Sequence, residues 1–350
     1  MPEIYAIFHQ PSGFSDRSSL LPLVEAVSTH PIRYGVAWEK LQARSWTLGH
    51  LLRRMGNRYY GSEWNVWVPW LDEWRCSQGI ADHGCIVHFF WGEFARPVRC
   101  SLFRKNGNIL IGTFHCSARR LPSVLAAGRD FREFDWITLM SKTQLDFFLA
   151  RGFPKDRLCV ILHGVDTQFF HPEPSTVRGE EKTLRCLLLG STERDHVFAA
   201  DVFSKLHPAQ ATLHVRTHAE YHKFYKGLET VQLLPPLDAQ GLLQAYQQAD
   251  LLFMPLLDCT ANNAFLESMA CGTPVMTNRV GGVSEYVDPI CNFVTNGKNV
   301  EEWVSLLTTL AHNRLELARR RVAVRAWAER FGWVTLAPRY LAFYEQVMSS

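Results

Sequence analysis

The sequence predicts an α/β protein made of two doubly wound, Rossmann-like domains that face each other across a crevice. The chain has 350 residues, and a domain averages roughly 100–200 residues, so the length fits two domains. Short apolar runs alternate with helical patterns in both halves, which is typical of parallel sheets covered by helices. A stretch that combines prolines, a glycine and a charge cluster separates the halves, as expected of a linker.

The first domain is expected over residues 1–165. Its first apolar run precedes a turn-rich stretch and then a helical pattern, the usual opening of a wound sheet. The later runs are short and apolar throughout, as in strands buried on both faces. The predicted elements are a strand at 4–8, a helix at 20–29 and strands at 86–90, 109–114, 136–140 and 157–162.

The second domain is expected over residues 166–332 and opens with the linker at 166–182. A C-terminal helix at 333–350 is expected to pack back on the first domain. In open sheets of this kind, ligands bind at the carboxyl ends of the strands. The predicted elements are strands at 184–189, 212–216, 251–255 and 274–278, and helices at 197–206, 239–248 and 262–270.

The composition excludes several classes of protein. With 47% hydrophobic and 20% charged residues, the chain can bury a sizeable core, which excludes disorder as its main state. The nine cysteines are scattered without a C-x-x-C pair, so we expect free thiols and neither a zinc site nor a disulfide framework. A net charge of +3 is too small for general nucleic-acid binding. No apolar run is long enough to cross a bilayer, and Glu3 stands where a secretory signal would carry a basic residue.

The first half of the chain is mildly basic and rich in tryptophan. Residues 1–165 hold 20 Lys and Arg against 14 Asp and Glu, a balance of +6, and residues 38–91 contain seven of the 11 tryptophans. Core packing with a solvated basic face explains this pattern. An interfacial segment that meets a membrane or a lipid-linked acceptor explains it as well, and so does sugar stacking on indoles. We predict a cytoplasmic protein, with peripheral contact at the inner membrane face under the second interpretation.

The most informative stretch follows the predicted strand at 251–255. Thr260 is expected to cap a helix that ends at Ala270, and the free N–H groups at its start, beside Asn262 and Asn263, form an anion site. Glu267 lies four residues after Asn263, on the same face and about 6 Å further along. This arrangement matches the diphosphate and ribose of a nucleotide, because a carboxylate accepts hydrogen bonds from both hydroxyls of a ribose.

These residues also resemble the donor-binding motif of retaining glycosyltransferases of family 4, the glycosyl transferases group 1. The family's "E-A-M-A-x-G-x-P-V" and "G-G-x-x-E" are similar to ESMACGTPV at 267–275 and GGVSE at 281–285. HGVDTQFFHP at 163–172 resembles the family's interdomain "N-G-V-D-x-x-x-F-x-P", and 331–344 resembles its terminal "F-S-W…Y" helix. The resemblance covers nearly all of the second half and is loose in the first, at 12–14, before His88 and at 113–115.

The resemblance implies a GT-B fold and a retaining transfer from a UDP- or GDP-linked sugar, used as co-substrate with no metal or other cofactor. The acceptor is a glycan, a lipid-linked molecule or a small molecule. A non-catalytic nucleotide-sugar-binding protein and a nucleotide-sugar epimerase of the same fold are the alternatives. The residues assigned are His115 and Asp258 to catalysis, and Gly13, Arg194, Thr260, Asn262, Asn263 and Glu267 to donor binding.

The chain departs from the family pattern at two places. Eight residues before Glu267 the family has a second glutamate, but this chain has Cys259. Either the adjacent Asp258 supplies the carboxylate, or Thr260 and the two asparagines that follow it bind the sugar. The family's basic residues after the first strand of the second domain are also displaced, and Arg194 is the only strong cation near that loop in the sequence.

Overall fold

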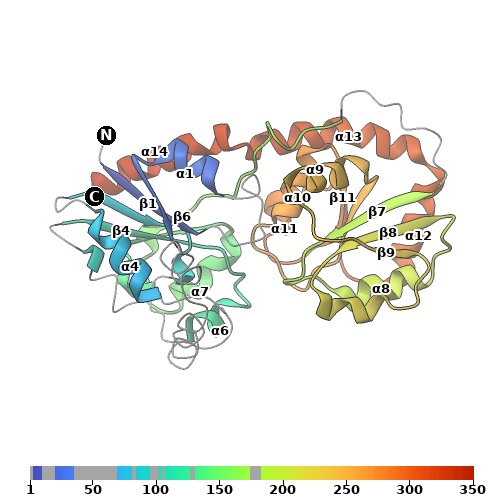
Figure 1. The fold of residues 1–350 in the computed structure, drawn as a ribbon, viewed down its shortest axis with the longest axis horizontal. Coiled ribbons are helices and arrows are strands. Elements are labelled where there is room, and N and C mark those ends of the chain that lie inside the picture. Colours follow the sequence, from blue (N-terminus) through green and yellow to red (C-terminus); the bar gives the residue numbers. More distant parts are fainter. Residues whose placement is uncertain are drawn as a thin grey trace, which may run out of the picture. The chain divides into compact units, whose positions relative to one another are not determined.

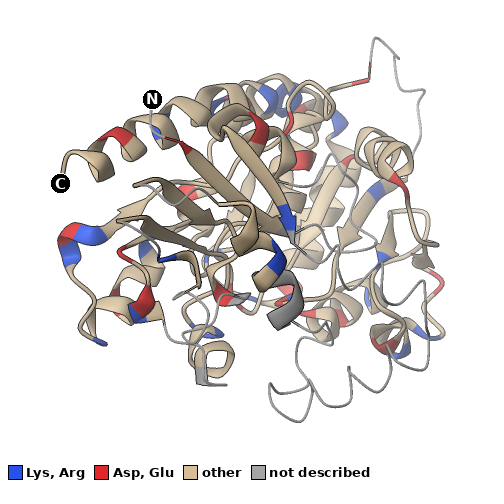
Figure 2. Ribbon diagram, turned by 60° about the vertical axis from the view of Figure 1, so that its left-hand side comes forward, with Lys and Arg blue, Asp and Glu red and all other residues tan. Residues whose placement is uncertain are grey.

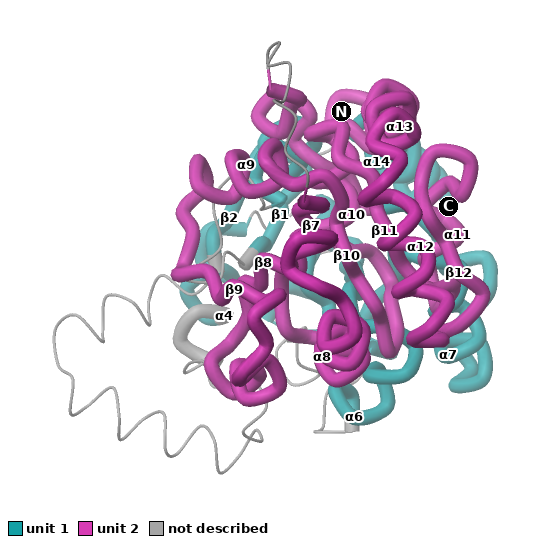
Figure 3. Tube along the Cα trace, turned by 90° about the vertical axis from the view of Figure 1, so that its right-hand side faces the viewer, with its two compact units in different colours: residues 1–162, 337–350 teal, residues 163–336 magenta. Residues whose placement is uncertain are grey.

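The computed structural model describes residues 3–9, 20–34, 69–80, 84–94, 102–104, 107–126, 131–173 and 183–350. The chain divides into two compact units, drawn in different colours in Figure 3. Unit 1 comprises residues 1–162 and 337–350, and unit 2 comprises residues 163–336. The chain therefore enters unit 2 at His163 and returns to unit 1 inside the last helix, α14 (Trp333–Met348).

Unit 1 contains a six-stranded parallel sheet with the strand order β2-β1-β3-β4-β5-β6 (Figure 1). Short 3-10 helices, labelled η, follow two of its strands, β3 and β5, and two of its helices, α6 and α7. In chain order the elements are β1 (Ile4–His9), α1 (Leu21–Val27), β2 (His30–Tyr34), α4 (Pro69–Gln78), β3 (Ile86–Phe89), η3 (Gly92–Phe94), β4 (Ile109–Phe114), α6 (Leu121–Ala126), η4 (Phe131–Glu133), β5 (Trp136–Leu139), η5 (Lys142–Gln144), α7 (Leu145–Leu149), η6 (Lys155–Arg157) and β6 (Leu158–Val160).

Unit 2 contains a second six-stranded parallel sheet, with the order β12-β11-β10-β7-β8-β9. Its elements are β7 (Leu184–Leu189), α8 (His196–Ser204), β8 (Ala211–Arg216), η7 (Ala219–Tyr225), β9 (Val231–Leu233), α9 (Ala239–Gln248), β10 (Leu251–Met254), α10 (Asn263–Ala270), β11 (Val275–Asn278), α11 (Val283–Tyr286), β12 (Phe293–Thr295), α12 (Val300–His312), α13 (Arg314–Ala328) and η8 (Glu329–Phe331).

Apolar strands explain why both sheets are buried. Every residue of β3, β5, β10 and β11 is buried, as expected where helices cover both faces of a parallel sheet. In unit 2, α8 and α12 cover one face, where Trp303 lies edge-on to Phe198 and Phe253 with ring centroids 5.1 Å apart in each pair. Figure 1 shows α9 and α10 on the opposite face. The predicted α/β class with two Rossmann-like sheets is confirmed.

Three strands, β2, β9 and β12, were not predicted, and each lies at an edge of its sheet. An edge strand is covered less completely and need not be apolar. β2 begins with His30 and Pro31 and also carries Arg33, while β9 is three residues long and largely exposed. The continuous apolar runs that mark the central strands are therefore missing from β2 and β9.

Charged residues of both signs lie mainly on helices and loops (Figure 2). In the part of the chain that the structure describes, every cysteine is a free thiol. No helix there is long and apolar enough to cross a membrane. Nor does any group of three His, Cys, Asp or Glu side chains in that part gather as metal ligands. Most of the tryptophan-rich stretch at 38–91, with its expected membrane contact, lies outside the described residues.

Candidate functional site

The loop after β7 carries Arg194, whose guanidinium donates hydrogen bonds to three surrounding oxygen atoms. Its Nε donates to the Leu189 carbonyl at 3.1 Å, one Nη donates to the Thr192 carbonyl at 2.6 Å, and the other donates to Oδ1 of Asn262 at 3.1 Å. The guanidinium also lies against Gly190, where an added Cβ would meet Nε at 2.9 Å. Gly190 has φ +94, a left-handed backbone that other residues rarely adopt.

The same loop runs along the loop after β10. The Asp195 N–H donates to the Pro255 carbonyl and the Leu257 N–H donates to the Glu193 carbonyl, both at 2.9 Å. Glu193 has φ +59, which turns the chain between these contacts. This pairing brings Arg194 to the start of α10, although 68 residues separate it from Asn262.

Asn262 caps α10, because its Oδ1 accepts a hydrogen bond from the Ala264 N–H at 3.1 Å. The expectation that Thr260 is the cap was wrong: the chain is not helical until Asn263. Thr260 is only 3% exposed, and its hydroxyl has no hydrogen-bond partner among the described residues. A buried hydroxyl without a partner is costly, so the Thr260 side chain marks a place where a ligand atom would be stabilising.

Two other predicted residues are held by side chains from outside α10. Glu267 is 3% exposed, and its carboxylate accepts a hydrogen bond from the Tyr246 hydroxyl of α9 at 2.7 Å. The Asn263 side chain hydrogen-bonds His163, the first residue of unit 2. Burial lowers the pKa of His163 to about 4, so this imidazole is neutral at pH 7.

Asp258 and Cys259 occupy the place where the family pattern has its first glutamate. Oδ1 of Asp258 accepts a hydrogen bond from the Cys259 N–H at 2.8 Å, and the Cys259 thiol faces the Thr260 carbonyl at 3.4 Å. Burial raises the pKa of this thiol to about 12, so it is neutral at pH 7. Both residues lie against Gly281 (φ +50), where an added Cβ would meet the Cys259 carbonyl at 2.2 Å.

The electrostatics of this end of the sheet involve a second cation. Burial lowers the pKa of Arg194, and the nearby charge of Glu267 opposes that shift. Lys298, which follows β12, forms an ion pair with Asp195, the cap of α8. Arg194 is the only strong cation near this loop in the sequence, but the fold also brings Lys298 there, which 103 residues separate from Asp195.

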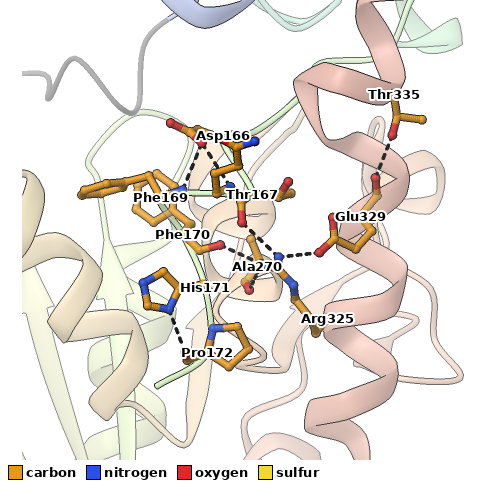
Figure 4. Close-up of polar contacts among 11 residues, drawn as sticks. Asp166, Thr167, Phe169, Phe170, His171, Pro172, Ala270, Arg325, Glu329 and Thr335 are labelled. Atoms are coloured by element: carbon orange, nitrogen blue, oxygen red, sulfur yellow. Dashed lines mark hydrogen bonds and ion pairs between the residues drawn. The ribbon is translucent and has the colours of Figure 1, made fainter. Parts of the chain in front are cut away.

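The other end of α10 is bound to the segment that enters unit 2 (Figure 4). Arg325 of α13 donates to the carbonyls of Ala270 at 2.6 Å, Phe170 at 2.7 Å and Thr167 at 2.9 Å, and it also pairs with Glu329. A cation suits the negative end of a helix dipole. Segment 163–172 is thus hydrogen-bonded to both ends of the helix that carries the candidate site.

In unit 1, His115 follows β4. Its ring stacks on Trp91, with centroids 3.7 Å apart at an interplanar angle of 14°, and Nε2 lies 2.6 Å from the Phe90 carbonyl. His88 on β3 is fully buried instead. It forms hydrogen bonds of 2.7 Å with both Tyr344 of α14 and Thr113 of β4, and burial lowers its pKa to about 3.

Within unit 2 the structure brings Arg194 directly to Asn262 and leaves Asp258 bound to its own loop. Gly13 lies outside the described residues. Sequence reasoning missed Tyr246 and Lys298. Tyr246 sits on the buried face of the amphipathic α9, where a tyrosine needs a partner for its hydroxyl, whereas no local signal marks Lys298.

Residues 184–313 match the sequence profile of a known family, Glycosyl transferases group 1. Over this stretch the chain is similar to the glycosyl transferases group 1. It starts at β7 and ends just after α12, so it contains Arg194, the loop after β10 and all of α10. The family resemblance drawn from the sequence is confirmed for this part of the chain.

Curated relatives of the chain carry the name D-inositol 3-phosphate glycosyltransferase. The protein from Saccharomonospora viridis is 29% identical over 123 residues, which are 35% of this chain and 28% of the relative. The protein from Nocardia farcinica is 31% identical over 121 residues, which are 34% of this chain and 27% of the relative. The chain therefore matches little more than a quarter of the length of each relative.

Solved structures extend the similarity of fold beyond residues 184–313. HepE from Anabaena, solved with UDP-glucose, has a TM-score of 0.70 at 16% identity, with 100% of both chains covered. Sucrose-phosphate synthase from Thermosynechococcus elongatus has a TM-score of 0.67 at 14% identity, again with 100% of both chains covered. The whole chain has the GT-B fold.

Proposed function

We propose that this protein is a retaining, metal-independent hexosyltransferase. It takes the sugar of a UDP- or GDP-linked donor and transfers it to a glycan, a lipid-linked molecule or a small molecule. The observation that carries this proposal is the contact between Arg194 and Asn262. It sets a fixed cation beside the start of α10, which Asn262 caps, and next to the Thr260 hydroxyl, for which the described residues offer no hydrogen-bond partner.

The leaving group of such a donor is a nucleoside diphosphate, on which negative charge builds up as the glycosidic bond breaks. In our proposal Arg194 and the positive end of the α10 dipole stabilise that charge. The reacting sugar carbon passes through an oxocarbenium-like state, and the departing phosphate takes the acceptor's proton. Glu267 binds the ribose, and Asn263 and Thr260 bind the diphosphate or the sugar.

His115 and Asp258 are proposed to contact the transferred sugar. The imidazole of His115 is held in one orientation by the Trp91 ring and the Phe90 carbonyl, which is what a residue that binds a transition state requires. Asp258 is part-exposed, and its Oδ1 accepts a hydrogen bond from the Cys259 N–H of the same loop. A neighbouring structure was solved with UDP-glucose, which makes UDP-glucose the first donor to try.

A panel of UDP- and GDP-linked sugars tests the proposal through release of UDP or GDP, with and without acceptors. We expect one donor to be hydrolysed slowly without acceptor. Arg194→Met is expected to lower that rate about tenfold or more, because it removes a preorganised charge. The exposed Arg319 on α13 offers a matched control, and Arg319→Met is expected to leave the rate unchanged. No release from any donor would contradict the proposal.

A second candidate is a non-catalytic nucleotide-sugar-binding protein. It is favoured by Cys259, a buried neutral thiol at the place of a family carboxylate. This candidate predicts that a nucleotide sugar raises the melting temperature while no nucleotide is released. A ligand at 100 times its Kd stabilises a protein by about 2.7 kcal/mol, which a thermal-shift screen detects easily.

A further inference from the structure

The backbone around His115 is held from both sides by two buried side chains. His115 follows β4, which lies between β3 and β5 in the sheet of unit 1. Glu93 comes from η3, just after β3, and Gln144 comes from η5, just after β5. Each neighbouring strand therefore contributes one polar side chain to the segment at the end of β4.

Glu93 holds the N–H groups of this segment. Its Oε1 accepts hydrogen bonds from the backbone N–H of His115 and from that of Cys116, the second at 2.6 Å. The side chain is 1% exposed, and burial raises its pKa. Its other oxygen has no hydrogen-bond partner among the described residues. Burying a carboxyl group in this way is costly, and the two hydrogen bonds from the backbone offset part of that cost.

Gln144 holds the carbonyl groups on the other side. Its Nε2 donates to the carbonyls of Phe114 at 3.0 Å and Cys116 at 2.8 Å. Its Oε1 accepts from the N–H groups of Met140 at 2.9 Å and Ser141 at 3.1 Å, so the amide itself cannot turn over without losing all four bonds. Glu93 and Gln144 together fix four backbone groups of residues 114–116.

The His115 side chain is fixed by the same part of the fold. Trp91 and Phe90, which contact the imidazole, lie within three residues of Glu93. Main chain and ring are therefore held by one continuous segment, 90–93, and by Gln144 opposite. Such support by buried neighbours is what keeps a reacting group within a fraction of an ångström of its working position.

We infer that Glu93 and Gln144 are positioning residues for His115. This inference rests on the proposed function, in which His115 contacts the transferred sugar. Neither residue is expected to touch substrate. A displacement of about 1 Å at a reacting group can lower a rate about a hundredfold, so loss of either support is expected to lower turnover while nucleotide binding is retained.

The test compares turnover, nucleotide affinity and stability in a small set of variants. Glu93→Met keeps the volume but removes the acceptor, and we expect a fall in kcat of about tenfold to a hundredfold with the Kd for the donor nucleotide unchanged. Glu93→Gln retains an oxygen for both N–H groups, and we expect it to restore kcat to within about threefold of the natural protein. Gln144→Met is expected to resemble Glu93→Met.

Tyr344→Phe provides the matched control, because it removes a buried hydrogen bond to His88 elsewhere in unit 1. It is expected to lower the free energy of unfolding without lowering kcat. If Tyr344→Phe and Glu93→Met lower kcat equally, or if Glu93→Gln does not restore it, the positioning role is overturned.

A readout that does not need turnover separates this inference from the proposed function. The imidazole signals of His115, assigned in the NMR spectrum from their loss in His115→Ala, report the ring's orientation directly. We expect them to shift in Glu93→Met and Gln144→Met and to return in Glu93→Gln. Unmoved signals overturn the positioning role, whereas shifted signals in a protein that hydrolyses no donor contradict only the proposed function.

Discussion

The guanidinium of Arg194 donates a hydrogen bond to Oδ1 of Asn262 at 3.1 Å, and the same Oδ1 accepts the Ala264 N–H at the start of α10. One oxygen therefore joins the loop after β7 to the helix that forms the candidate donor site. The guanidinium can take this position because Gly190 has no Cβ, which would otherwise lie 2.9 Å from Nε of Arg194.

Gly190→Ala is expected to weaken nucleotide-sugar binding about tenfold or more, since the new Cβ would displace the guanidinium, and a hydrogen bond to a charged group contributes about 1.5–3 kcal/mol. Gly227→Ala is the control. Gly227 has a similar φ of +81 but nothing within 4 Å of its Cβ position, so its replacement adds backbone strain without a clash. Calorimetric titration of both variants measures the difference, and equal affinities would contradict the role of Arg194.

Glu267→Gln is expected to weaken donor binding about tenfold to a hundredfold, because a hydrogen bond to a charged group contributes about 1.5–3 kcal/mol. The amide can still accept the Tyr246 hydroxyl, so the protein should fold. Tyr246→Phe removes that hydrogen bond but leaves the carboxylate, and we expect it to change donor affinity by less than about threefold. If Tyr246→Phe weakens donor binding as much as Glu267→Gln does, Glu267 stabilises the core through Tyr246 and does not bind the ribose.

Asp258→Asn is expected to lower transfer about tenfold to a hundredfold, or about 1.4–2.8 kcal/mol in the transition state, if its charge contacts the sugar. The asparagine oxygen can still accept the Cys259 N–H, so the loop should persist. Cys259→Ser is expected to change little. A silent Asp258→Asn would assign Asp258 to the loop alone, and Cys259→Glu would then show, through a changed sugar preference, whether that position faces the donor.

Acid is expected to destabilise unit 1 through His88. Burial lowers its folded-state pKa to about 3, against about 6.5 in an unfolded chain. Between these values the unfolded state binds more protons, so stability is complete above about pH 6.5 and falls as the pH drops, by at most about 1.4 kcal/mol per pH unit. Urea unfolding at pH 7, 6 and 5 measures how steeply the free energy of unfolding changes with pH. His88→Gln should reduce the slope but not abolish it, because burial also lowers the pKa values of His163 and His196, each to about 4. His312→Gln, at an exposed position, is the control variant.

The sequence predicts the central strands well, because a strand buried on both faces is a run of apolar residues. Ile109–Phe114 and Leu184–Leu189 coincide with the predicted bounds. Three of the four edge strands were missed, because β2 and β9 are largely exposed and β12 has only three residues, whereas the apolar edge strand β6 was predicted. The cap of α10 was misplaced by two residues, since Thr260 and Asn262 are both good capping residues and only the path of the loop decides between them.

The candidate site was predictable as a set of residue types but not as a set of contacts. Asn263 and Glu267 follow from helical spacing alone. The contact of Arg194 with Asn262 depends on two loops that pair across 68 residues of sequence, and the support of His115 by Gln144 depends on the order of neighbouring strands. Such relations require the sheet topology, which no local pattern encodes.

The hydrogen bonds of Arg325 also decide how this protein can be cut into fragments. The family match spans residues 184–313. The guanidinium that binds the carbonyl of Ala270 belongs to Arg325, which lies after residue 313, and it also binds the carbonyls of Thr167 and Phe170, which lie before residue 184. A recombinant fragment with the family's limits would lose both. A fragment that retains these hydrogen bonds and the ion pair with Glu329 must begin no later than Thr167 and end no earlier than Glu329, as one with the limits of unit 2 does.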